Sequence, residues 1–212
     1  HYYLRVAERI ERVMNAKGFT VLECTIAFTL TALFAASFYT AFRVMNAEMW
    51  RNKDYSDTSL SAKNVMDRLS KDVQESACVV ASYGGNTTST TCLILKVPCI
   101  DNTGTPTSIS SQFDYVTYKI NPLDSTQLFR SVDVLNGTSN REGGVDTSDV
   151  VVGRKVSSIS FSYVGTPLAS VASATIPTMK YINAQITTQG TTLGTTQDTQ
   201  VDSDLMLRNY IT

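Results

Sequence analysis

The chain has 212 residues and a net charge of −1, and only 17% of its residues are Asp, Glu, Lys or Arg. This low charge content argues against a nucleic-acid partner, because phosphate binding requires clustered Lys and Arg side chains. The only histidine, His1, stands at the first position, which argues against a histidine-based zinc site or a Ser-His-Asp triad.

The first 43 residues have the composition of a membrane anchor behind a basic leader. Residues 19–42 form an apolar run with a single charged residue, Glu23, and with no glycine or proline. As a helix this run would be about 36 Å long, enough to cross a hydrocarbon core of about 30 Å. The basic residues that precede it are Arg5, Arg9, Arg12 and Lys17. They predict that the N-terminal end stays in the cytoplasm and that the rest of the chain lies outside it.

Glu23 is the residue of this run that needs an explanation. A carboxylate at membrane depth costs several kcal/mol unless it has a partner. One interpretation is an interfacial glutamate near a helix end, whose side chain reaches the headgroups. The other requires a cation at the same depth, and cleavage between Gly18 and Phe19 would supply it as a new α-amine four residues before Glu23. A helix N-terminus also favours the carboxylate electrostatically.

The segment 17–23, KGFTVLE, resembles the processing site of type IV prepilins and type II secretion pseudopilins. That family has a basic leader ending in Gly, then Phe, three mostly apolar residues, Glu and a long apolar helix, and these elements occur here in the same order. Cys24 and Thr25 depart from the aliphatic residues that usually follow the Glu. No proline interrupts the apolar run, whereas many major pilins carry one near the position of Thr40.

The resemblance implies a route of processing and assembly. A membrane prepilin peptidase would cut after Gly18 and methylate the amine of Phe19, and Glu23 would pair with the Phe19 amine of a neighbouring subunit. Other pilin-like subunits would pack against the helix, and an assembly ATPase and a platform protein would move the subunits outward. The implied location is the inner membrane, crossed once, with an extracytoplasmic head in the periplasm or at the cell surface and in a filament after assembly.

Four segments are expected along the chain: a leader at 1–18, a transmembrane assembly helix at 19–43, a helical continuation packed on the head at 44–84, and a β-rich head at 85–212. The continuation carries an apolar stripe at helical spacing, made of Ala62, Met66, Leu69 and Val73. The helix should end before Gly84, with some looseness at 52–61.

Charged residues of the same segment are spaced four apart, as in Arg68–Asp72 and Lys71–Glu75. Pairs at this spacing face each other on the surface of a helix. They predict a solvated helix face.

The head reads as a series of short strands. Apolar or alternating stretches predict strands at 93–97, 113–120, 127–134, 156–164, 179–188 and 200–209. We expect 113–120 to form a hairpin with 127–134, and 179–188 to pair with 200–208. The segments 135–149 and 165–178 are expected to be loops. A helix followed by antiparallel strands predicts an α+β fold with the helix packed on an antiparallel sheet.

The resemblance extends into the head. The segments RLSKDVQESA at the helix end, SSISFSYV in the middle and LMLRN near the C-terminus are similar to those of J-type minor pseudopilins and PilW-like minor pilins. This implies a pilin-like fold and the role of a minor subunit in a tip or initiation complex.

The cysteines of the head would lie outside the cytoplasm, where disulfides persist. A Cys92–Cys99 bond would close a short loop around Pro98 and is the preferred pairing, with Cys78–Cys92 as the alternative, since pairing cannot be read from a sequence. Cys24 is interpreted as a small packing residue in the membrane helix.

An acidic, glycine-containing stretch follows the predicted hairpin. Oxygen ligands in such a loop can bind Ca²⁺, although the spacing matches no EF-hand, and a solvated acidic loop is the preferred interpretation. No cofactor is otherwise expected. The candidate ligands are Asp133, Glu142, Asp146 and Asp149.

Three functions remain open at this point. The first is a structural subunit, a minor pilin or minor pseudopilin. The second is a filament-tip adhesin or substrate-binding module that uses the loops 135–149 and 165–178, and the third is a signal-anchored envelope protein that never polymerises. An enzyme is the least expected class, because the sequence has no Gly-x-Ser-x-Gly motif, no phosphate loop and no internal histidine. Secretion, motility, DNA uptake and adhesion are not distinguished.

Overall fold

The computed structural model describes residues 20–107, 112–135, 138–192 and 194–207. The chain divides into two units, residues 1–49 and 50–212. One helix, α2 (Val21–Glu75), runs from the first unit into the second. The α+β class is confirmed, because this long helix is followed by antiparallel sheets.

Helix α2 is continuous over the stretch 52–61, where the sequence predicted looseness. No glycine or proline occurs within its bounds, so no residue interrupts the backbone hydrogen bonds. The hydroxyl of Thr58 donates to the carbonyls of Asp54 and Tyr55, at 3.0 and 2.9 Å. Such a bond satisfies the hydroxyl within its own helix, and the helix continues through Thr58 without a break.

The helix ends at Glu75, nine residues before the Gly84 that the sequence suggested as its stop. Ser76 closes it, because both its backbone N–H and its hydroxyl donate to the carbonyl of Val73, at 3.1 and 2.7 Å. The residues that follow are buried and form strand β1 (Cys78–Val79). The predicted helical continuation to residue 84 is therefore wrong over its last nine residues.

The second unit contains two main sheets, both antiparallel. The first has the order β1-β4-β5-β6-β7, with β4 at Cys92–Pro98, β5 at Phe113–Ile120, β6 at Gln127–Asp133 and β7 at Thr147–Arg154. The second has the order β11-β10-β8-β9, with β8 at Val156–Tyr163, β9 at Thr166–Pro167, β10 at Tyr181–Thr192 and β11 at Thr195–Met206. A small pair is formed by β2 (Ser82–Tyr83) and β3 (Asn86–Thr87).

The predicted strands are found, and both predicted pairings are confirmed. Strand β5 pairs with β6, and β10 pairs with β11 in a register that joins Tyr181 to Met206. The expected single sheet is wrong, since the strands divide between two. The expected loops are partly structured: 135–149 contains a 3-10 turn (η1, Arg141–Gly143) and the start of β7, and 165–178 contains β9 and the turns η2 (Leu168–Ser170) and η3 (Ile176–Thr178).

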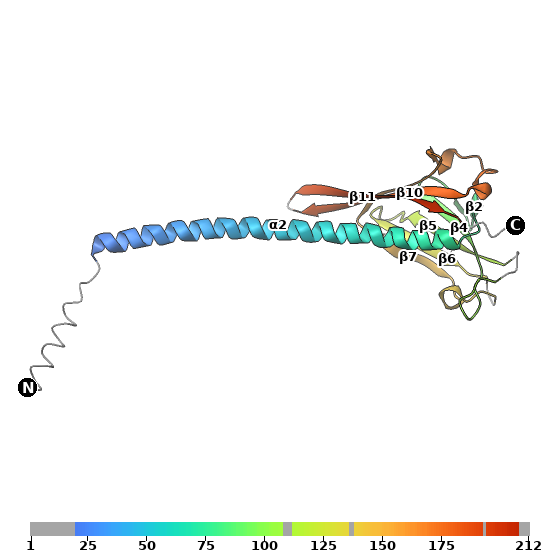
Figure 1. The fold of residues 1–212 in the computed structure, drawn as a ribbon, viewed down its shortest axis with the longest axis horizontal. Coiled ribbons are helices and arrows are strands. Elements are labelled where there is room, and N and C mark those ends of the chain that lie inside the picture. Colours follow the sequence, from blue (N-terminus) through green and yellow to red (C-terminus); the bar gives the residue numbers. More distant parts are fainter. Residues whose placement is uncertain (1–19, 108–111, 136–137, 193, 208–212) are drawn as a thin grey trace, which may run out of the picture. The chain divides into compact units, whose positions relative to one another are not determined.

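One hydrophobic core joins the later part of α2 to both sheets (Figure 1). Polar contacts fix the helix along them: Ser61 exchanges hydrogen bonds with the backbone of Arg154, and the Thr188 hydroxyl donates to the carbonyl of Thr58. Burial of each large apolar side chain contributes about 1.5–3 kcal/mol. Fully buried members include Val65 and Leu69 of α2, Leu95, Tyr118 and Leu128 of the first sheet, and Phe161, Ile182 and Ile186 of the second.

Candidate functional site

The predicted cleavage residues, Gly18 and Phe19, lie outside the residues that the structure describes. Glu23 lies in the first turn of α2 and is exposed. The N–H of Glu23 donates to the hydroxyl of Thr20 at 3.2 Å, and Oε2 of Glu23 accepts the N–H and the hydroxyl of Thr20 at 2.9 and 3.0 Å. This reciprocal pair is a capping box, which satisfies donors that a helix N-terminus leaves open. Oε1 of Glu23 makes no hydrogen bond with any described residue.

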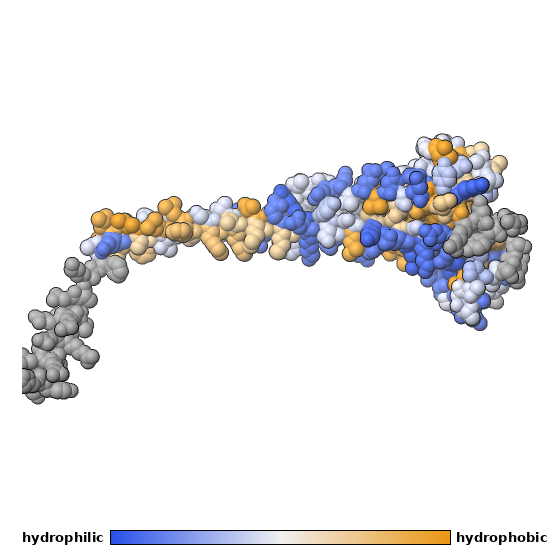
Figure 2. Space-filling model, viewed as in Figure 1, coloured by the Kyte–Doolittle hydropathy of each residue, from blue (hydrophilic) through white to orange (hydrophobic). Residues whose placement is uncertain are grey.

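The helix of the first unit is exposed over residues 20–45, and its side chains are mostly apolar as far as Phe42 (Figure 2). Its hydroxyls donate to carbonyls of the preceding turn, as Thr25 does to Val21 at 2.8 Å and Thr40 does to Ala36 at 2.8 Å. The hydroxyls therefore leave little unsatisfied polarity on the surface of the helix. An 18-residue stretch has a mean hydropathy of 1.8, so α2 is long and apolar enough to cross a membrane, a criterion that a signal sequence also meets.

A second site, in the other unit, is built on a buried ion pair. Asp72 of α2 accepts Nε and Nη2 of Arg130 from β6, at 2.6 and 3.2 Å, and it also accepts the hydroxyl of Tyr118 from β5 at 2.6 Å. Nη1 of Arg130 donates to Glu142 at 2.8 Å, and Glu142 also accepts Arg68 at 3.0 Å. The Asp72 and Arg130 side chains are 4% and 5% exposed.

Arg141 makes a parallel set of contacts on the same side of the unit. Its Nε donates to Asp114 at 3.1 Å, its Nη1 to Glu75 at 2.8 Å, and its Nη2 to the carbonyl of Pro98 at 3.1 Å. The Asp114 side chain is fully buried, and the Arg141 side chain is 8% exposed. The two buried arginines thus join the end of α2 to β5, β6 and the turn η1.

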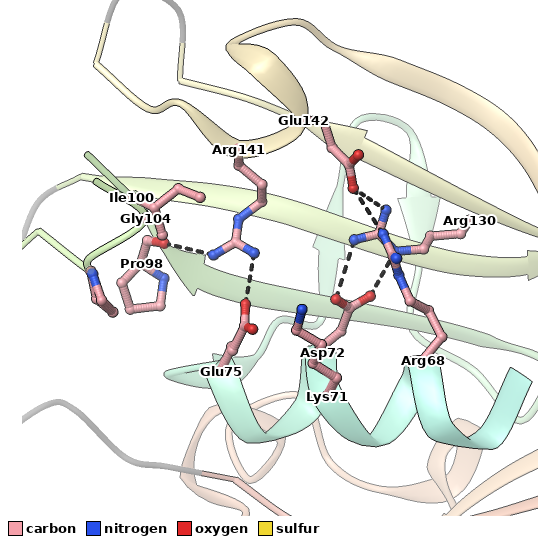
Figure 3. A pocket seen from close by; sticks show the side chains of 11 residues that line it. Arg68, Lys71, Asp72, Glu75, Pro98, Ile100, Gly104, Arg130, Arg141 and Glu142 are labelled. Atoms are coloured by element: carbon pink, nitrogen blue, oxygen red, sulfur yellow. Dashed lines mark hydrogen bonds and ion pairs between the residues drawn. The ribbon is translucent and has the colours of Figure 1, made fainter. Parts of the chain in front are cut away.

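Figure 3 shows that Arg130 and Arg141 lie on opposite sides of a hollow of about 410 Å³. Arg68 and Lys71 of α2 line it as well, with Gly104 and the prolines 98 and 106 as a further wall. The lining therefore carries four cations, and its carboxylates are Asp72, Glu75 and Glu142.

The buried network keeps its protons in place. Burial lowers the pKa of the Arg130 guanidinium, but the hydrogen bonds and the charge of Asp72 outweigh burial and hold this pKa above its ordinary value. Burial and the neighbouring charge of Asp72 raise the pKa of Tyr118 well above its ordinary value. Arg130 therefore stays charged and Tyr118 stays neutral throughout the physiological range.

The predicted disulfides are wrong for this fold, in which Cys78, Cys92 and Cys99 are free thiols. Cys92 begins β4 and Cys99 follows its other end, so seven residues of extended chain, roughly 23 Å, separate them, whereas bonded cysteines have Cα atoms within about 7 Å. Cys78 pairs with Lys96 across β1 and β4, which places it several residues along the strand from Cys92. The thiol of Cys99 donates to Asp114 at 3.4 Å.

The four candidate calcium ligands are not brought together. Asp133 accepts the hydroxyl of Tyr83, Asp146 accepts the N–H of Val134, Asp149 pairs with Lys119, and Glu142 binds two arginines. Each carboxylate already has its own donor on a different element. Within the described ranges, no three His, Cys, Asp or Glu side chains converge as metal ligands.

The sequence patterns did not indicate the hollow, and the prediction of a solvated helix face is wrong for Asp72, whose side chain is 4% exposed. The alternation along the strands could have indicated these buried charges. Arg130 stands between Leu128 and Val132 on the same face of β6, and Asp114 shares its face of β5 with Val116. A charged residue at a core-facing position requires a buried partner of opposite charge.

No protein-family model, no curated protein and no solved structure matches this chain. The two sites are therefore interpreted from their own chemistry.

Proposed function

We propose that this chain is a pilin-like subunit, a minor pilin or minor pseudopilin, that is cut after Gly18 and inserted into a filament through α2. In this proposal the helix crosses the inner membrane once, and the second unit is the extracytoplasmic head. Residue 19 becomes the N-terminus, and its α-amine binds Glu23 of a neighbouring subunit in the lipid. Pairing neutralises two charges that would each be expensive at membrane depth.

The observation that supports the proposal is the position of Glu23. It is the single charged residue in the apolar run 19–42, and it lies in the first turn of an exposed helix. Oε2 of Glu23 accepts the two hydrogen bonds of the cap from Thr20, whereas Oε1 has no donor among the described residues and is available to a donor from another chain. A cation supplied by a neighbour would then fix the axial register between two helices.

The capping box offers a competing explanation for Glu23, and one pair of substitutions separates the two. Glutamine also serves in a capping box, so Glu23→Gln keeps the cap and removes the charge, whereas Glu23→Ala removes both. If the charge acts, Glu23→Gln and Glu23→Ala both reduce co-purification of companion pilin-like subunits from detergent extracts. If only the cap acts, Glu23→Gln behaves as the unsubstituted protein.

Asp67→Asn is the matched control, because Asp67 is an exposed acid on the same helix and lies in the second unit. It removes one negative charge without touching the membrane helix. We expect it to leave co-purification unchanged. Normal co-purification of Glu23→Gln would overturn the charge-pair proposal.

A further inference from the structure

The hollow beside Arg130 and Arg141 is a site that assembly through the membrane helix does not use. It lies wholly in the second unit and is lined by residues of α2, β6, η1 and the segment 98–106. Its volume, about 410 Å³, falls within the range of small-molecule sites. Its lining is dominated by charged side chains, so a ligand would be recognised through charge and hydrogen bonds.

The cations of the lining point toward one space. Figure 3 shows Arg141 on one side, Arg130 and Arg68 on the other, and the Lys71 side chain rising from α2 between them. Arg130 and Arg141 are nine-tenths buried and are fixed by their carboxylate partners. Positive groups that are held close together raise the electrostatic potential in the space between them. An anion in that space would be attracted to them.

Donors remain available in the hollow after the internal contacts are made. A guanidinium has five N–H groups, and Arg130 and Arg141 each use three of theirs with described residues. Lys71 forms no hydrogen bond or ion pair with any described residue, although it is the cation on the helix wall of the hollow. Unused donors beside an unpaired ammonium favour a ligand that supplies acceptors.

The charge balance selects the kind of acceptor. The lining carries four cations and three carboxylates, and Asp114, buried behind it, pairs with Arg141 as a fourth carboxylate, so the charges around the hollow balance. A single carboxylate adds only one negative charge, and its planar pair of oxygens fits the fork of a guanidinium. A phosphate dianion would add two negative charges beside Glu75 and Glu142 and would be repelled by them. We propose that the hollow binds the carboxylate group of a small ligand or of a peptide, held by Lys71 and the free N–H groups of Arg130 and Arg141.

The test is a ligand titration of the full chain in detergent micelles. The measured quantity is Tm, which rises when a ligand binds the folded state. N-acetylglycine serves as the carboxylate probe and N-acetylglycinamide as its uncharged counterpart. A peptide with a free C-terminus and its amidated form, run in parallel, distinguish a peptide source from a free small molecule. Only the two carboxylate forms are expected to raise Tm, and added NaCl should weaken their binding.

Lys71→Gln is the informative variant, because Lys71 has no partner to lose among the residues that the structure describes, and the fold should be unaffected. Loss of one charge-assisted hydrogen bond should weaken N-acetylglycine about tenfold or more. Lys63→Gln is the matched control, being an exposed lysine two turns earlier on α2 and outside the hollow, and should bind as the unsubstituted chain does.

Three results would overturn the assignment: equal affinity in Lys71→Gln, equal binding of N-acetylglycinamide, or tighter binding of inorganic phosphate than of N-acetylglycine. Absence of any rise in Tm at millimolar N-acetylglycine would do the same. None of these results bears on Glu23, so failure here leaves the assembly proposal standing and is distinguishable from its failure.

Discussion

Asp72 of α2 and Arg130 of β6 form a two-point ion pair, with Oδ2 to Nε at 2.6 Å and Oδ1 to Nη2 at 3.2 Å. Both side chains are buried, and the hydroxyl of Tyr118 satisfies Asp72 further. The pair therefore ties the last turns of the helix to the middle of the first sheet. The pair also holds Arg130 in place on one side of the hollow. The same contact therefore stabilises the second unit and positions a residue of the proposed ligand site.

Removing one member of this pair should destabilise the second unit strongly. Asp72→Ala leaves the Arg130 guanidinium buried with Glu142 as its remaining carboxylate. Loss of one partner from a buried pair costs about 3–5 kcal/mol, and because Glu142 still pairs with Arg130, the loss in free energy of unfolding should be about 3 kcal/mol. The free energy of unfolding in urea, measured on the full chain in micelles, gives this value.

Arg68→Ala is the matched comparison, because it breaks a pair with the same Glu142 in which the side chains are 46% and 30% exposed. An exposed pair contributes at most about 1 kcal/mol. Equal losses in the two variants would contradict the role given to burial.

Gly153 of β7 lies against the helix, and a methyl group there would be too close to it. A Cβ at this position would lie 2.7 Å from Cγ2 of Val65 and 3.2 Å from Cγ2 of Val156. Gly153→Ala should therefore lower the free energy of unfolding by about 1–3 kcal/mol, the usual effect of overpacking a core. Ser148→Ala, at an exposed position on the same strand, should change it little, and a neutral Gly153→Ala would show that α2 does not pack here.

The periodic segments could be predicted because each had one strong signal. The run 156–164 alternates apolar and serine residues, and Ile159 and Phe161 are indeed buried. The apolar stripe Ala62–Val73 is likewise buried. Strand β7 was missed, because Asp149, an acidic residue that disfavours strands, stands just before its apolar stretch.

The hollow could not be predicted, because it joins residues that are far apart in the sequence. Asp72 meets Arg130, and Glu75 meets Arg141, only after the sheet has formed. Spacing along a helix suggested instead that Asp72 pairs with Arg68. The helix end was misplaced for a related reason: Ser76 closes α2 through a local hydrogen bond, and the later glycines serve other turns.

Tyr83 should make stability sensitive to alkaline pH. Burial, followed by the hydrogen bond and charge of Asp133, raises the pKa of Tyr83 to about 12. In the unfolded chain it is about 10, so between these values the folded state holds the proton more tightly. This contribution to stability is complete below about pH 10 and is lost as pH rises toward about 12.

Tyr83→Phe isolates the contribution of Tyr83. The difference in free energy of unfolding between the unsubstituted chain and Tyr83→Phe should be constant below about pH 10 and should shrink between about pH 10 and 12. Urea unfolding across this range measures it. A difference that stays constant up to pH 12 would show that Asp133 does not hold this hydroxyl.

The three cysteines of the second unit should remain free thiols. Their positions along β1 and β4 are too far apart for an internal disulfide. Burial, followed by the charge of Asp114, raises the pKa of Cys99 to about 11, so it should react slowly while folded. Alkylation in denaturant without a reductant, followed by mass spectrometry, should label all three. Protection of Cys92 and Cys99 together would instead indicate the bond inferred from the sequence.

In the proposed assembly, a new amine at residue 19 meets the carboxylate of Glu23 in a neighbouring chain. Its most direct test is mass spectrometry of the N-terminal peptide of the chain isolated from cells with an active prepilin peptidase. The proposal predicts a chain that begins at Phe19 with an N-methylated amine. A chain that retains residues 1–18 in those cells would contradict it and would leave α2 as a simple anchor.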